Sequence, residues 1–221
     1  MNIVNHYEWS THIPLLKSLT EVMQPKLIVE LGTGLHSTPI FLGSAAEKLY
    51  FIDNDQAWLS HIQESNTFDN RCTVRYHGLG EEISLTTFLR QLTAEKKAEI
   101  SNYYTALSSE INSINSSPKM LFVDHYTCAR ALSINLLFES FDVIAYHDCQ
   151  PKGTKWYEYY FNQKLLDNYE LHYLKSPTSW TGCFIKKSFN DYSKLNAVMR
   201  PYIDVYCDEN QLSRDVMSFG K

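Results

Sequence analysis

The stretch Lys26–Thr38 reads KLIVELGTGLHST, and it indicates a strand followed by a glycine turn and a helix. Its first part, Leu27–Leu31, is a short apolar run with β-branched residues, as is typical of a buried parallel strand. Gly32 and Gly34 follow at once, and glycine lets the backbone turn sharply or approach a ligand closely. Thr38 and the proline behind it predict the beginning of a helix, whose free N–H groups can face a ligand.

A second strand end lies at the spacing of a nucleoside site. The run Lys48–Ile52 predicts a strand, and Asp53 ends it about 20 residues after Gly32. In nucleoside-binding α/β folds, an acidic residue at this spacing holds the ribose hydroxyls. The two strand ends together therefore predict a nucleoside-containing ligand.

Two details separate this turn from the dinucleotide fingerprint of nicotinamide enzymes. Ser37 stands where the third glycine would be, and Glu30 within the strand is atypical. The motif ELGTG with its downstream acid instead resembles motifs one and two of the class I S-adenosylmethionine-dependent methyltransferases. With EWSTHIP at 8–14 and IDNDQAW at 52–58, the sequence resembles bacterial small-molecule methyltransferases of that class. The resemblance is tight over roughly the first 60 residues and extends in element order over 8–187.

The resemblance implies S-adenosylmethionine as the cofactor and methyl transfer as the reaction. The cofactor-binding residues that follow from the motifs are Glu30, Gly32, Thr33, Gly34, Ser37, Thr38, Asp53, Asn54 and Asp124. A helix predicted over residues 11–23 precedes the first strand, and such a helix commonly covers the cofactor in this family. His12 and Trp9 could line its mouth, but packing on the surface is the interpretation that we favour. No adenine contact is assigned.

The rest of the chain alternates between strand and helix patterns. Strands are expected at Cys72–Tyr76, Met120–Val123, Phe141–Tyr146, Tyr169–Leu174 and Trp180–Ile185, and helices at 55–65, within 83–115, and at Ala129–Phe138, Lys155–Leu166 and Tyr192–Met199. We therefore expect an α/β fold with a doubly wound, mostly parallel seven-stranded sheet and a C-terminal antiparallel hairpin, the Rossmann-like methyltransferase fold. A single domain is expected over 1–221, with a cap helix in 1–25, a helical insert at 83–117 and an extension at 189–221.

Histidines and aspartates at two further strand ends are the candidates for chemistry. Methyl transfer mainly requires that the two reactants be positioned, but a hydroxyl acceptor also needs a base or a metal. His147 is the first candidate base, because imidazole has a reference pKa of roughly 6.5. Asp148 could orient its ring or the acceptor, and His125 is the second candidate base.

A divalent metal is possible but is not the favoured interpretation. Asp124 and Asp148 fall where metal-dependent O-methyltransferases of this class carry magnesium ligands. The neighbour of the second acid is Cys149, which is a poor ligand for a hard cation. We therefore assign no metal ligand.

Composition narrows the range of partners. The net charge is −5, and the 20 lysines and arginines are scattered, which disfavours nucleic acid. No apolar run approaches the roughly 20 residues of a membrane span, no signal peptide is indicated, and five cysteines without a C-x-x-C pair suit a reducing cytosol. We expect a cytoplasmic enzyme that methylates a small molecule, and we favour an oxygen acceptor over a nitrogen acceptor. A homodimer is compatible with this expectation. The alternatives are a non-catalytic cofactor-binding module and, less favoured, a nicotinamide-dependent oxidoreductase.

Overall fold

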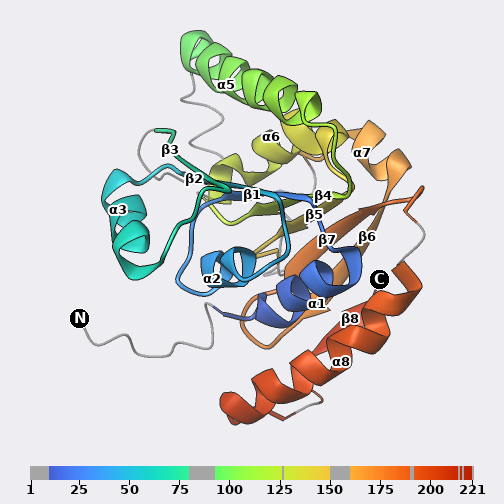
Figure 1. Cartoon of the computed structure of the whole chain (residues 1–221). Helices are drawn as coiled ribbons and strands as arrows, with labels where there is room; N and C mark the ends of the chain where they lie inside the picture. Colours follow the sequence, from blue (N-terminus) through green and yellow to red (C-terminus); the bar gives the residue numbers. More distant parts are fainter. Residues whose placement is uncertain are drawn as a thin grey trace.

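The computed structural model describes residues 10–79, 93–125, 127–149, 160–189, 192–213, 215 and 217–220, and these form a sheet with helices on both faces (Figure 1). The strands are β1 (Leu27–Leu31), β2 (Lys48–Asp53), β3 (Cys72–Tyr76), β4 (Lys119–Val123), β5 (Val143–Tyr146), β6 (Tyr169–Lys175), β7 (Thr181–Lys186) and β8 (Ser218–Gly220). Their order in the sheet is β3-β2-β1-β4-β5-β7-β6-β8. The first five strands are parallel, whereas β7, β6 and β8 each pair antiparallel with their neighbour. The predicted doubly wound sheet with a C-terminal antiparallel hairpin is thus confirmed.

The predicted strand count was wrong, because the sheet has eight strands rather than seven. The additional strand, β8, has three residues and pairs with Tyr173–Lys175 of β6. So short a segment shows no alternation of apolar and polar residues from which a strand could be predicted. Its one large side chain, Phe219, stacks on His172 with ring centroids 5.7 Å apart.

The helices agree with the prediction except near their ends. They are α1 (Ile13–Met23), α2 (Ser37–Leu42), α3 (Gln56–Ser65), α5 (Ala94–Ser113), α6 (Thr127–Leu137), α7 (Gln163–Asn168) and α8 (Tyr192–Glu209), with a 3₁₀ turn at Phe138–Ser140. The prediction stopped the last helix at Met199, but α8 continues through Pro201 because its apolar face continues. Thr38 was expected to cap α2, yet His36 is the N-cap residue and Thr38 lies within the helix. The helix patterns expected at 83–92 and 155–159, like Trp9, lie outside the described residues.

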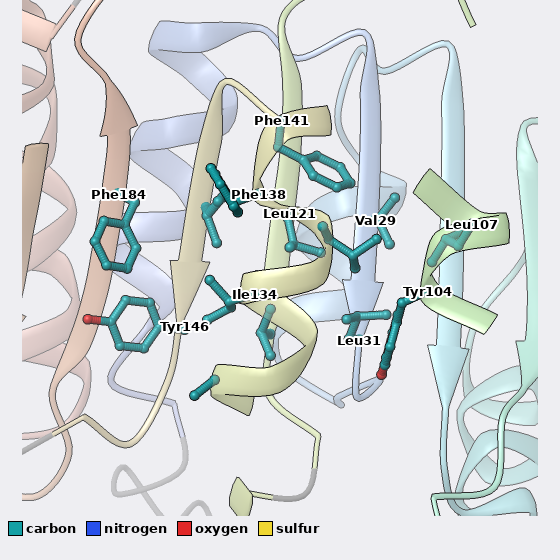
Figure 2. Packing of buried hydrophobic residues seen from close by; sticks show 14 of the residues in the cluster. Val29, Leu31, Tyr104, Leu107, Leu121, Ile134, Phe138, Phe141, Tyr146 and Phe184 are labelled. Carbon is teal, nitrogen blue, oxygen red and sulfur yellow. The ribbon is translucent and has the colours of Figure 1, made fainter. Parts of the chain in front are cut away.

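Two apolar layers hold the helices on the sheet. Side chains of α5 and α6 pack on one face, and Figure 2 shows Tyr104, Leu107 and Ile134 meeting Val29, Leu31 and Leu121 of the strands. Side chains of α1, α2 and α8 pack on the other face. Because successive strand residues point to opposite faces, Glu30 points to the side of α2. This places a carboxyl group inside an apolar layer.

The glycine turn brings the ends of β1 and β4 into contact. Gly32 has a φ of +87°, and a Cβ built on it would lie 2.3 Å from the backbone nitrogen of His125. A side chain at this position would therefore be strained and would push the two strand ends apart. A hydrogen bond joins the two strand ends beside this glycine, because the backbone N–H of Asp124 donates to the carbonyl of Leu31 at 2.7 Å.

Cys72 and Cys183 are free thiols, as expected. Among the residues that the structure describes, no helix combines the length and the apolar character needed to cross a membrane.

Candidate active site

A cavity of about 290 Å³ lies where β1, β2 and β4 end. Ligands of open α/β sheets bind at the carboxyl ends of the strands, so this is the place expected for a ligand. The cavity is lined by Gly32, Thr33, Asp53, Asn54, Asp55, Trp58, Asp124, His125 and Arg130. Five of the predicted cofactor residues and one of the predicted catalytic residues therefore line one cavity.

The carboxylate of Asp53 holds the glycine turn in place. Its Oδ2 accepts hydrogen bonds from the backbone N–H of Thr33 at 2.6 Å and from the Thr33 hydroxyl at 2.8 Å. Its Oδ1 accepts from the backbone N–H of Asp55 at 2.9 Å. Burial raises the pKa of Asp53, and these hydrogen bonds oppose that effect. These bonds fix the Asp53 carboxylate in the wall of the cavity.

Trp58 closes the same turn from the side of α3. Its indole N–H donates to the carbonyl of Thr33 at 2.6 Å, while 38% of the residue remains exposed. Ile62, four residues further along α3, is buried in the core. The Trp58 indole is part of the cavity wall.

Three predicted cofactor residues lie behind the cavity rather than in its wall. Glu30 is fully buried and accepts hydrogen bonds from the hydroxyls of Ser37 and of Thr38, the latter at 2.7 Å. The Thr38 hydroxyl in turn accepts from the backbone N–H of Gly34 at 3.1 Å. Burial raises the pKa of Glu30 to about 8, although the two hydroxyl contacts lower it in part. Glu30, Ser37 and Thr38 thus fix the glycine turn on α2 from inside the apolar layer.

His147 lies beside the cavity and both of its ring nitrogens are engaged. Nε2 is 3.0 Å from the Thr11 hydroxyl and 3.1 Å from the Ser179 hydroxyl. Those hydroxyls donate their own hydrogens elsewhere, Thr11 to the carbonyl of Ser179 and Ser179 to Asp148. Nε2 must therefore be the donor in both contacts. Nδ1 faces the carboxylate of Asp124 at 3.4 Å.

The carboxylates around His147 favour its charged form. Burial lowers the pKa of His147, but Asp124 and Asp148 outweigh this effect and raise the pKa above its ordinary value. Burial alone would raise the pKa of each aspartate, yet the nearby positive charges of His147 and Arg130 hold both below their usual range. In this arrangement His147 is an N–H donor on both sides, which is not the state of a general base.

Arg130, which was not among the predicted site residues, connects the ends of β4 and β5. Its guanidinium is 2.9 Å from Asp124 and 3.2 Å from Asp148, and the residue is only 4% exposed. It also donates to the backbone carbonyls of Asp124, His125 and His147. A single buried cation therefore fixes the ends of β4 and β5 relative to each other.

A signal for Arg130 does exist in the sequence. It is the only charged residue of α6, TCARALSINLL, and it lies in the first turn, six residues after Asp124. For Thr11 and Ser179 we find no such signal, since serine and threonine are common in turns and at helix starts. Thr11 lies just before α1 and Ser179 lies in the β6–β7 turn, so they reach His147 only when the chain folds and brings these two segments together.

The remaining predicted residues have distinct places. His125 lines the cavity, and its Nε2 is 3.1 Å from the Ser133 hydroxyl and 3.4 Å from the Tyr104 hydroxyl. Asp148 has a left-handed backbone with a φ of +57°, which aspartate tolerates better than most residues, and 42% of its side chain is exposed. His12 is buried against His147 with ring centroids 4.6 Å apart, so it packs inside rather than on the surface.

Glu30 generates a test of how the glycine turn is held. A carboxyl whose pKa is higher in the folded state stabilises the fold fully below its unfolded pKa of 4.5, and this contribution is lost as the pH rises toward about 8. We expect Glu30→Gln, which cannot ionise, to lose less stability than the wild type between these pH values. Urea unfolding at several pH values measures this, with the exposed Glu47→Gln as the control. Parallel pH curves for Glu30→Gln and the wild type would contradict the account.

Comparison with known proteins supports the fold. No protein-family model and no curated protein matches the sequence. Among solved structures, the chain is similar to a methyltransferase-like protein from Silicibacter pomeroyi, with 12% identity, a TM-score of 0.52, and coverage of 90% of this chain and 96% of that one. It is also similar to the spermidine synthase from Thermotoga maritima, with 9% identity, a TM-score of 0.50, and coverage of 84% and 61%. At these identities the likeness shows a shared fold alone.

Proposed function

We propose that the chain is an S-adenosylmethionine-dependent methyltransferase that acts on a hydroxyl group of a small molecule. The observation that carries the proposal is the cavity at which the glycine turn, Asp53 and Asp124 meet. Each of them ends a different strand, and together they match the resemblance in the sequence. The fold shared with a methyltransferase-like protein agrees with this proposal.

The residues of the cavity suit a cationic nucleoside. Asp53 lies in the cavity wall beside the turn at Gly32 and Thr33, where the ribose hydroxyls of a nucleoside would meet its carboxylate. The cavity lining contains three carboxylates, from Asp53, Asp55 and Asp124, and one guanidinium, from Arg130, and this excess of negative charge favours a positively charged ligand. At about 290 Å³ the cavity is at the lower end of the roughly 300–1,000 Å³ usual for small-molecule sites. S-adenosylmethionine supplies an activated methyl group and its own leaving group when bound.

The protein's part in the reaction is to position the cofactor and the acceptor and to remove one proton from the acceptor hydroxyl. His125 borders the cavity, so we propose it as the group that takes the proton of the acceptor hydroxyl. His147 donates on both sides and fixes Asp124, which makes it a positioning residue. The sequence favoured the opposite order of these two histidines.

One observation favours a second candidate, a module that binds the cofactor without turnover. Both ring nitrogens of His147, the first candidate base, already have partners. Nε2 contacts the Thr11 and Ser179 hydroxyls and Nδ1 faces two carboxylates, so neither nitrogen is available to accept a proton. A nicotinamide-dependent oxidoreductase is less well supported, because β7 runs antiparallel beside β5 and the third glycine of the fingerprint is absent.

Cofactor binding is the first test. We expect S-adenosylhomocysteine to bind the wild type with a stoichiometry of one in isothermal titration calorimetry. Asp53→Asn should weaken binding at least about tenfold, because an amide cannot replace both carboxylate acceptors. Asp167→Asn, an exposed change on α7, is the control and should bind as the wild type does. Absence of binding by a folded wild-type protein at high micromolar ligand would refute the proposed function.

Turnover separates the roles of the two histidines. With labelled S-adenosylmethionine and a panel of small hydroxyl compounds, His125→Asn should lower the methylation rate by roughly 10²–10⁴-fold, the usual contribution of a positioned base. The affinity for S-adenosylhomocysteine should change little in this variant. If His147→Asn loses as much activity and His125→Asn none, the sequence-based assignment of His147 is the correct one. Binding without methylation of any acceptor would favour the non-catalytic module.

A further inference from the structure

His12 is a polar side chain that is buried inside the protein. It is 2% exposed, and within the described part of the chain neither of its ring nitrogens has a hydrogen-bond partner. A neutral imidazole has one N–H donor and one acceptor nitrogen, and a buried group without a partner costs roughly 1–3 kcal/mol. Such a group in a folded protein points to a bound water or ion.

His12 does not stand alone, because two other ligand-type side chains converge on it. Its ring meets the ring of His147 edge to face at 4.6 Å between centroids. His12, Asp124 and His147 each offer one atom, and these three atoms lie within 4.8 Å of one another. The residues come from the segment before α1, from the end of β4 and from the end of β5, so only the fold brings them together.

We propose that His12, Asp124 and His147 bind a divalent first-row transition metal such as Zn²⁺. Two imidazoles and one carboxylate are typical three-ligand sets for Zn²⁺ or Fe²⁺, with further positions left open. Imidazole nitrogens also suit these metals better than Mg²⁺, which prefers oxygen. This differs from the expectation in the sequence, which considered only carboxylates and assigned no metal ligand.

The tautomer of His147 fits such a site. Nε2 donates to the Thr11 and Ser179 hydroxyls, and metal-binding histidines commonly use their second nitrogen in this way. Nδ1 points at the Asp124 carboxylate across 3.4 Å, and in the metal-free protein a proton on Nδ1 fills this gap. A bound metal would displace that proton, because only neutral imidazole binds a metal ion. Tetrahedral Zn²⁺ ligands lie about 3.4 Å apart, so the three atoms must close by at most about 1.4 Å, which small side-chain rotations achieve.

The surrounding charges also admit a cation. Arg130 contacts Oδ1 of Asp124, and His147 faces the same atom, so neither contact uses Oδ2. Asp148 adds a second carboxylate 3.8 Å from His147. Once His147 has lost its proton to become a metal ligand, the fixed charges are two carboxylates against one guanidinium. Under the proposed function, a metal here would lower the pKa of the acceptor hydroxyl, but the site itself does not depend on that function.

Metal titration of the full-length protein tests this inference. After dialysis against a chelator, we expect the wild type to bind one equivalent of Zn²⁺ by calorimetry and to give visible absorption with Co²⁺. His12→Phe, which preserves the packing on Phe122, should weaken Zn²⁺ binding at least about tenfold, since losing even an outer-shell partner costs 10–100-fold. Zn²⁺ should raise the thermal midpoint of the wild type and not that of His12→Phe.

The controls keep the result independent of folding and of the cofactor. His61→Ala, an exposed histidine on α3, should bind Zn²⁺ as the wild type does and excludes surface binding. His12→Gln replaces His12→Phe if the latter does not fold. Equal Zn²⁺ affinity in the His12 variant and the wild type, no stoichiometric binding of Zn²⁺ or Co²⁺, or tighter binding of Mg²⁺ than of Zn²⁺ would each overturn the proposal. Because S-adenosylhomocysteine binding is measured on the metal-free protein, failure of this inference and failure of the proposed function are distinguishable.

Discussion

The buried guanidinium of Arg130 is the interaction on which the candidate site depends. It contacts the Asp124 and Asp148 carboxylates and three backbone carbonyls at the ends of β4 and β5. A buried charge is tolerated only when it is paired and hydrogen-bonded, and here both conditions are met. Arg130 therefore fixes the position of the Asp124 side chain, which lines the cavity and also faces His147. Removing this one cation would leave two partly buried carboxylates facing each other.

A second constraint acts on the opposite side of the cavity. Gly32 lets β1 and β4 approach so closely that any side chain would collide with the backbone of His125. Asp53 holds Thr33 from the side of β2, and Glu30 holds the start of α2 from below. The glycine turn in the cavity wall is therefore held in position by buried carboxyl groups. This explains why Glu30, which the motif assigned to cofactor binding, does not reach the cavity.

Local patterns in the sequence predicted much of the fold. β1 and β3 were predicted at their observed bounds because short apolar runs next to turn residues are strong strand signals. The glycine turn and Asp53 were also predicted to lie together, and they do. In contrast, β8 is too short to show the alternation of apolar and polar residues that predicts a strand. The full length of α8 was not predicted, because this helix contains Pro201 and a proline usually ends a helix. Both depend on packing against distant parts of the chain, which local patterns do not contain.

The composition of the site was harder to predict than its place. Thr11 and Ser179 meet at His147 across large sequence separations, and the burial of His12 results from α1 packing on the sheet. The sequence named the strand ends that carry chemistry, but it did not reveal which ring nitrogens would be engaged. His147 accordingly changes from a candidate base to a residue with donors on both sides. Tertiary hydrogen bonds, rather than residue identity, decide that role.

A crystal structure with S-adenosylhomocysteine tests the central claim most directly. The account predicts the nucleoside in the cavity lined by Gly32, Thr33 and Asp53, with a ribose hydroxyl on the Asp53 carboxylate and the sulfur toward Asp124 and His125. A nucleoside bound elsewhere on the molecule, or bound without contact to Asp53, would contradict the account.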